Sequence, residues 1–234
     1  MGDAKIFYRE CKKICSEKLK ILGFKSYKTH YYRVLDKSVQ MFCFYAYGGR
    51  REVRFDIMPL GNEYMSRDWD GPLWLTSFIP WGDIEILIYD NNSSNDVETR
   101  EKFFARKICD ALNEVVLSGF EIANTTEDAY CLKRFWLEDC MKSPIQYIYE
   151  DYMWYFQLGQ YEKAKKMLLG SLNNWKKEND IRLECDIKDE YDMTSYRNLM
   201  RPIQQWCKKT DEEIKNEIKR LEIQNLEILK WTRK

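Results

Sequence analysis

The 234-residue chain is predicted to fold as an α+β domain followed by an all-helical region. Two observations predict the first part: aromatic-rich strand candidates follow one another closely near the N-terminus, and an amphipathic helix stands on each side of them. A third observation, helical periodicity over almost all of the chain after Thr125, predicts the second. We therefore expect an α+β domain over residues 1–122 and a helical region over residues 123–234 that packs on it.

The first helix is expected from about Ala4 to Leu22. Its apolar residues fall on one stripe and its charged residues lie largely elsewhere, as in a helix with one buried face. Gly23 follows at once, and glycine commonly ends helices.

Three strands are expected next, over Thr29–Leu35, Val39–Tyr47 and Glu52–Met58. The middle segment is apolar on both faces, so we expect a central strand that is covered on both sides. The third alternates apolar and charged residues, which predicts a half-buried strand. Gly48-Gly49 favours a hairpin between these two strands, and the three form an antiparallel meander.

Residues 60–83 are irregular, because glycine and proline interrupt them repeatedly. Ile84–Tyr89 is predicted to be a fourth strand. Asn95 with Glu98 indicates the start of a helix that reaches about Ser118, where Gly119 would end it. The buried stripe expected for this helix comprises Phe104, Ile108, Ala111, Leu112 and Val115.

The C-terminal region contains one helical hairpin, with helices over Pro144–Leu158 and about Tyr161–Lys177. Leu158–Ala164 resembles the turn of a tetratricopeptide hairpin, since it has a turn glycine, a tyrosine two residues later and a small alanine. No second copy follows 34 residues away. The sequence therefore predicts a single tetratricopeptide-like hairpin and no peptide-binding array.

Two segments near the C-terminus leave alternatives. Alternating apolar residues over Ile181–Ile187 would allow a short strand. Thr210 and Glu213 form a capping box that starts a last helix. Its apolar seam has coiled-coil spacing and would support a homodimer through residues 211–231, although two heptads favour packing on the chain's own hairpin. The seam residues are Ile214, Ile218, Leu221, Asn225 and Ile228.

The composition restricts the class of protein. Lys plus Arg and Asp plus Glu are 38 each, so no global field attracts nucleic acid or anionic lipid. No secretory signal and no apolar run near 18 residues is present, and we expect a cytoplasmic protein without membrane contact. The eight cysteines form no CxxC pair and His30 is the only histidine, so we expect reduced, mostly buried thiols.

Candidate catalytic groups are few. Asp56, Asp83, Glu85 and Asp90 would lie on or beside strands as in metal-dependent nucleases, but the Glu-x-Lys of those enzymes is absent and a solvated sheet face explains them better. His30 has no recognisable nucleophile beside it. No nucleotide-binding motif is present. We therefore expect no catalysis, no metal and no cofactor.

Two groups of residues are candidates for partner binding. The first is a basic and aromatic hairpin that could stack bases and contact phosphates, or make ordinary cation–π and ion-pair contacts. The second is a loop of tryptophans, which are frequent in binding hot spots but could equally cap the sheet as core. The hairpin residues are Tyr45, Tyr47, Arg50, Arg51 and Arg54, and the loop residues are Trp69, Trp74 and Trp81.

The N-terminal part resembles a known family. Gly23-Phe24-Lys25, Tyr31-Tyr32-Arg33 and the strand ends Phe42-Cys43-Phe44 and Phe55-Asp56-Ile57 are similar to the helix, turn and strands of the bacterial domain-of-unknown-function family numbered 4304. The resemblance covers roughly residues 5–120. It implies the fold and a bacterial or phage source, and it assigns no active-site residue.

These observations favour a non-enzymatic cytoplasmic protein that binds another protein. A role in toxin immunity, or in phage defence or anti-defence, is the hypothesis, because compact, aromatic-rich proteins without catalytic motifs suit that work. The alternative is a single-stranded nucleic-acid binder that uses the Arg50–Arg54 hairpin.

Overall fold

The computed structural model describes six stretches of the chain, namely residues 3–27, 29–47, 50–62, 96–140, 152–184 and 201–231. The chain forms two compact units. Unit 1 comprises residues 1–60, 64–140 and 225–234, and unit 2 comprises residues 61–63 and 141–224. The boundary expected after residue 122 lies between two helices that both belong to unit 1. No helix in the described stretches is long and apolar enough to cross a membrane.

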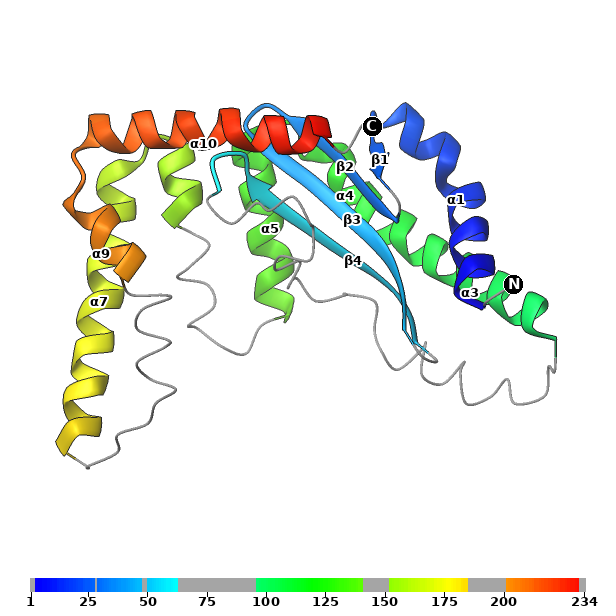
Figure 1. Ribbon diagram of the computed structural model, residues 1–234, viewed down its shortest axis with the longest axis horizontal. Helices are drawn as coiled ribbons and strands as arrows, with labels where there is room; N and C mark the ends of the chain where they lie inside the picture. Colours follow the sequence, from blue (N-terminus) through cyan, green and yellow to red (C-terminus); the bar gives the residue numbers. More distant parts are fainter. Residues whose placement is uncertain are drawn as a thin grey trace. The chain divides into compact units, whose positions relative to one another are not determined.

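Unit 1 is built on a four-stranded antiparallel sheet (Figure 1). The strands, in their order across the sheet, are β1 (Lys25–Tyr27), β2 (His30–Leu35), β3 (Ser38–Tyr47) and β4 (Arg50–Pro59). The α+β class, the antiparallel meander and the central, doubly covered β3 are confirmed. The sequence pattern does not predict the three-residue β1, and the strand expected over Ile84–Tyr89 lies outside the described residues.

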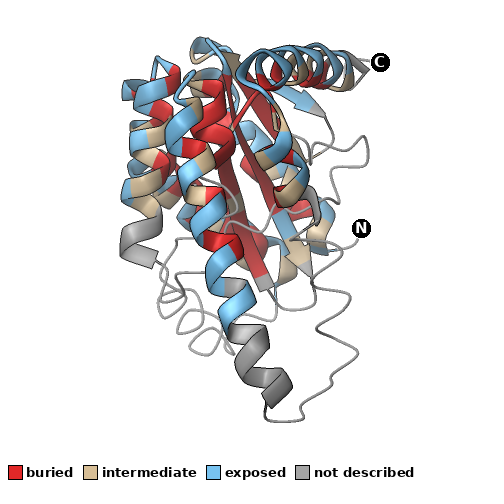
Figure 2. Cartoon of the chain, turned by 90° about the vertical axis from the view of Figure 1, so that its left-hand side faces the viewer, coloured by how far each residue is buried: buried red, intermediate tan, exposed pale blue. Residues whose placement is uncertain are grey.

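Helices cover one face of this sheet, and Figure 2 shows how far the strands are buried. Phe7 of α1 (Asp3–Ile21) meets Phe44 edge-on, with 6.3 Å between the ring centroids. Trp136 of α5 (Thr126–Cys140) meets Phe55 in the same way at 4.9 Å. Alternate residues of a strand point to opposite faces, so the other face needs its own cover.

That cover comes from the C-terminal end of α10 (Asp211–Trp231). Leu226 and Leu229 pack against a buried cluster that includes Tyr32, Val39 and Met41. The Tyr32 hydroxyl donates a hydrogen bond of 2.7 Å to the Leu229 carbonyl. The sheet therefore depends on residues from the far end of the described chain.

The helix α1 runs parallel to α3 (Val97–Ala111) and its continuation, as ion pairs at both ends show (Figure 1). The helix stops where predicted, and Gly23 has the positive φ of 76° that favours glycine.

Cys11, Cys15 and Cys109 are buried between the two helices, and hydrogen bonding and burial raise the pKa of the Cys15 thiol. The raised pKa values of Cys15 and Cys109 keep these two thiols protonated at neutral pH, and all three cysteines serve as core.

The second helix of unit 1 differs from the prediction at both ends. Asp96 is its N-cap, and its carboxylate accepts hydrogen bonds of 3.2 Å from the backbone N–H groups of Glu98 and Thr99. The helix does not end at Gly119. It continues through a π-helical segment, η1 (Leu112–Leu117), into α4 (Ser118–Ile122). A Cβ on Gly119 would lie 2.9 Å from Trp136, so this glycine permits close packing instead of ending the helix.

Unit 2 is mostly helical in its described residues from 152 onward. It contains a short helix over residues 152–157, then α7 (Tyr161–Glu184), α9 (Arg201–Lys208) and the first part of α10. Gly159 forms the turn before α7 with φ of 73° and Ala164 is fully buried, but the likeness to a tetratricopeptide hairpin stays a prediction. The short strand considered over Ile181–Ile187 is wrong for residues 181–184, because α7 extends through Glu184, and residues 185–187 lie outside the described residues.

The capping box of α10 is confirmed. The Thr210 N–H donates to Glu213 at 2.7 Å, and the Glu213 N–H donates back to the Thr210 hydroxyl at 3.3 Å. Four seam residues, Ile214, Ile218, Leu221 and Asn225, are buried within the single chain. A homodimer through this helix stays a prediction, and it would have to use other side chains, such as the half-exposed Ile223.

Candidate functional site

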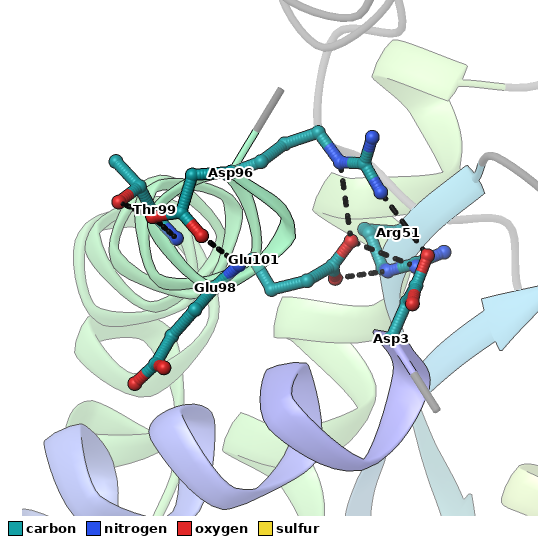
Figure 3. A network of polar contacts seen from close by, with 7 residues as sticks. Asp3, Arg51, Asp96, Glu98, Thr99 and Glu101 are labelled. Atoms are coloured by element: carbon teal, nitrogen blue, oxygen red, sulfur yellow. Dashed lines mark hydrogen bonds and ion pairs between the residues drawn. The ribbon is translucent and has the colours of Figure 1, made fainter. Parts of the chain in front are cut away.

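Arg51 does not lie on an exposed hairpin surface. Its side chain is 5% exposed and its guanidinium forms a two-pronged ion pair with the buried Glu101, at 2.7 and 3.0 Å (Figure 3). Arg100 contacts Glu101 at 3.5 Å and Asp3 at 3.1 Å, and thereby extends this network to the surface. The charge of Arg51 is satisfied inside the protein, so it is not available to a phosphate or a partner.

Arg54 and Tyr45 are the hairpin residues that the structure brings together. The guanidinium lies over the tyrosine ring, 4.2 Å from its centroid, and its Nε contacts Glu52 at 2.5 Å. Both residues are more than a third exposed. Because Glu52 offsets the charge of Arg54, the nucleic-acid alternative retains less free positive charge than the sequence suggested.

Several predicted site residues lie outside the described part. The backbones of Tyr47 and Arg50 pair across the hairpin, but their side chains are not among those described. Trp69, Trp74 and Trp81 also lie outside the described residues. Their assignment to a binding surface stays a prediction.

The sequence pattern placed the strand carboxylate Asp56 on a solvated sheet face. This prediction is wrong. Asp56 is 4% exposed and pairs with the buried Lys133 of α5 at 3.2 Å, so it fastens that helix to β4. Asp83, Glu85 and Asp90 lie outside the described residues.

His30 lies opposite Cys43 in the ladder between β2 and β3. Burial raises the pKa of the Cys43 thiol to about 11, so it remains protonated at neutral pH. A nucleophilic cysteine needs the thiolate form. This pair therefore lacks the electrostatics of a cysteine–histidine catalytic site.

The structure adds a candidate that the sequence did not indicate. An open groove of about 930 Å³ lies between two helical walls of unit 1, one formed by η1 and α4 and the other by α5. We call it the α4–α5 groove. Three of its lining residues are large, apolar and exposed: Val115 at 39%, Ile122 at 72% and Phe135 at 62%. Clustered exposed apolar residues mark interaction surfaces in soluble proteins.

The π-helical segment accounts for the exposure of Val115. The expected stripe placed Val115 three residues after Leu112, but the residues buried beyond Leu112 are Val116 and Leu117, four and five residues after it. A π-turn adds one residue to the helical repeat. The predicted burial of Val115 is therefore wrong, because the extra residue rotates it out of the core and into the groove.

Each wall presents a single helical stripe. Val115, Ser118, Gly119 and Ile122 on one side, and Asp128, Cys131, Leu132 and Phe135 on the other, both follow the spacing i, i+3, i+4, i+7. Such residues share one helix face. The groove thus presents one apolar stripe from each of two helices, an arrangement against which a third helix could pack.

Hydrogen bonds fix the N-terminal end of α5, which begins one wall of the groove. Thr125 and Asp128 form a reciprocal capping box at the start of α5, with hydrogen bonds of 3.1 and 3.2 Å. Asp36, in the turn before β3, accepts hydrogen bonds of 3.1 and 2.6 Å from the N–H and hydroxyl of Thr126. These bonds lower the pKa of the Asp36 carboxyl and hold α5 against the sheet.

Sequence reasoning could not find this groove directly. The pattern places Phe135 in a helix but ends the preceding helix before Ile122, and it does not show the packing of Trp136 against Gly119 that brings α4 and α5 together. One signal was present in α5. Its buried residues include Ala129 and Lys133, and Phe135 does not lie on the same face of the helix as these two.

No protein-family model, curated protein or solved structure matches the chain.

Proposed function

We propose that the chain is a non-enzymatic protein-binding module that holds a short helix of another protein in the α4–α5 groove. The observation that carries this proposal is the pair of apolar stripes with exposed Val115, Ile122 and Phe135. Helix-in-groove recognition uses apolar anchors at i, i+3, i+4 and i+7, which is the spacing of both walls. Toxin immunity, or phage defence or anti-defence, is the biological role that we propose for such a module.

Burial of these side chains supplies the driving force. Covering a large apolar side chain contributes about 1.5–3 kcal/mol before the ordering costs of association are subtracted. Three such side chains and the smaller wall residues suit a micromolar, reversible complex. The resemblance to family 4304 supports a bacterial or phage source and stays a prediction.

A phage-displayed library of 14-residue helical peptides, with apolar residues at i, i+3, i+4 and i+7, tests the proposal. We expect enriched peptides to bind in a fluorescence-polarisation titration. Phe135→Asp and Ile122→Asp should each weaken this binding at least tenfold, because both side chains are exposed and can be changed without disturbing the core. Leu169→Asp on α7 is the matched control, since it alters another exposed apolar residue.

Cys131 provides an independent readout because its exposed thiol lines the groove. A bound peptide should slow its modification by a maleimide, as followed by mass spectrometry, and leave Cys207 unaffected. An enriched peptide that binds the Phe135→Asp and Ile122→Asp variants as well as the unchanged protein would contradict the proposal. So would a library from which no binder emerges.

A further inference from the structure

The dimensions of the α4–α5 groove limit what can occupy it. The stripe from Asp128 to Phe135 covers two helical turns, or about 10 Å. A partner helix of two to three turns would match this length. An extended segment would leave backbone N–H and C=O groups facing apolar side chains, which is costly.

The lining of the groove includes two small, exposed side chains. Ser118 and Cys131 lie among the larger Ile122 and Phe135, whereas the space beside Gly119 is taken by Trp136 and Leu132. Small exposed residues leave room for a large side chain of the partner, such as Leu, Phe or Trp. The best match is therefore a helix with a bulky residue at the centre of its apolar stripe.

The charges at the groove have one sign. Glu114 and Asp128 line it, and both are exposed. Among the described residues that line the groove, none is basic. Glu127 lies in the first turn of α5 and is also exposed, whereas Glu121 is already paired with Lys18 at 3.2 Å. Complementary charges at the rim of an interface favour the matching partner and repel others.

We propose that the occupant is a basic amphipathic helix of a partner protein, with Lys or Arg beside the apolar stripe and a bulky residue at its centre. This inference rests on the proposed function and adds the chemistry of the partner. The rim selects by charge, and the apolar walls supply most of the affinity.

Two fluorescein-labelled 14-residue peptides test the inference. Both carry Leu, Phe, Leu and Leu at the four stripe positions, and they differ only in having Lys or Glu at the four flanking positions. We expect the lysine peptide to bind about tenfold more tightly at about 50 mM NaCl, because rim ion pairs are worth up to about fivefold each. At about 500 mM NaCl the preference should fall to about twofold, since salt screens exposed charges.

Charge-neutralising variants locate the effect. Glu114→Gln with Asp128→Asn should remove most of the preference for the lysine peptide, and asparagine keeps an acceptor for the cap of α5. A Glu17→Gln, Glu162→Gln double variant removes the same charge from exposed positions on other helices and should keep the preference. A lysine peptide with a scrambled stripe should bind at least tenfold more weakly, which excludes attraction by charge alone.

The outcomes separate the two proposals. Equal binding of both peptides, lost in Phe135→Asp, would overturn the basic partner and leave the helix-binding function in place. Tighter binding of the glutamate peptide would do the same. Binding of neither peptide would overturn the inference, and an empty library as well would overturn the proposed function.

Discussion

At the scale of single residues, the most informative contact is the ion pair between Arg51 and Glu101. Both side chains are at most 5% exposed, and the pair joins β4 to α3 across 50 positions of sequence. Two charges removed from water in this way are stable only together, because either one alone would be buried without compensation. The pair therefore serves mainly to position α3 against β4, and it contributes little net free energy to the stability of the fold.

Arg51→Met is expected to lower the free energy of unfolding by about 3–5 kcal/mol, because it leaves the buried carboxylate of Glu101 with only its longer contact to Arg100, at 3.5 Å. The double variant with Glu101→Met should recover much of this loss, since apolar side chains can replace a buried pair. Urea denaturation measures both. Arg220→Met, which breaks a surface pair with Glu217, is the control and should change stability by about 0–1 kcal/mol. Equal effects of the two arginine substitutions would contradict this account.

Asp36 gives a prediction for pH. Hydrogen bonds from Thr126 lower the pKa of its carboxyl in the folded state, so its contribution is present above the unfolded pKa and is lost as pH falls through the folded pKa. Asp36→Asn keeps a residue that tolerates the φ of 50°. We expect it to cost about 1 kcal/mol above about pH 5 and nothing at lower pH, once the folded carboxyl is protonated. Unfolding curves of both proteins from pH 2 to 7 provide the comparison, and a difference that persists at the acidic end would refute it.

At the scale of elements, the π-helical segment decides which face of the long helix is exposed. The sequence pattern of residues 112–117 predicts an ordinary amphipathic α-helix, because nothing in Leu112–Leu117 itself indicates the additional residue per turn of a π-helix. The packing of the following turn requires it: Leu117 and Phe120 are fully buried. The groove wall is thus a consequence of tertiary packing that overrides a local pattern.

Two helical glycines should respond to alanine with opposite signs. A Cβ on Gly119 meets Trp136 at 2.9 Å and Leu132 at 3.2 Å, and Trp136 is itself held between aromatic rings, so Gly119→Ala should destabilise by about 1–2 kcal/mol. Gly170 of α7 has open space, so Gly170→Ala should stabilise by about 0.5–1 kcal/mol through the helix propensity of alanine. Thermal unfolding of the two variants checks both signs. A stabilising Gly119→Ala would show that Trp136 moves aside.

At the scale of the whole molecule, much of unit 1 could be predicted from the sequence. The amphipathic character of α1, the stop at Gly23 and the doubly apolar β3 are local signals, and the structure confirms them. Ile14, expected on the buried stripe of α1, is 41% exposed. The position of Arg51 was not predicted, because its partner Glu101 lies far away in sequence and the arginine was assigned to the exposed hairpin. In the structure it belongs to β4, on the same face as Val53 and Phe55. The α4–α5 groove is likewise a property of two helices in contact, and one sequence does not reveal that contact.

Leu229 tests how strongly the far end of α10 supports the sheet. It is 3% exposed and packs against Tyr32, Val39 and Met41, so Leu229→Ala should cost about 2–5 kcal/mol of unfolding free energy. Ile223→Ala, on an exposed part of the same helix, should stay within about 0.5 kcal/mol. Guanidinium denaturation distinguishes these values, and similar small losses would show that α10 is dispensable to unit 1.

The packing of Leu226 and Leu229 on the sheet affects how the nascent chain folds during translation. A ribosome finishes β4 long before it reaches Leu226 and Leu229, which cover one face of the sheet. Until those leucines emerge, the face around Tyr32 and Met41 stays open to water, and exposed apolar surface of this kind attracts chaperones and other nascent chains. Unit 1 therefore completes its folding after translation has passed α10, although its strands are made well before that helix.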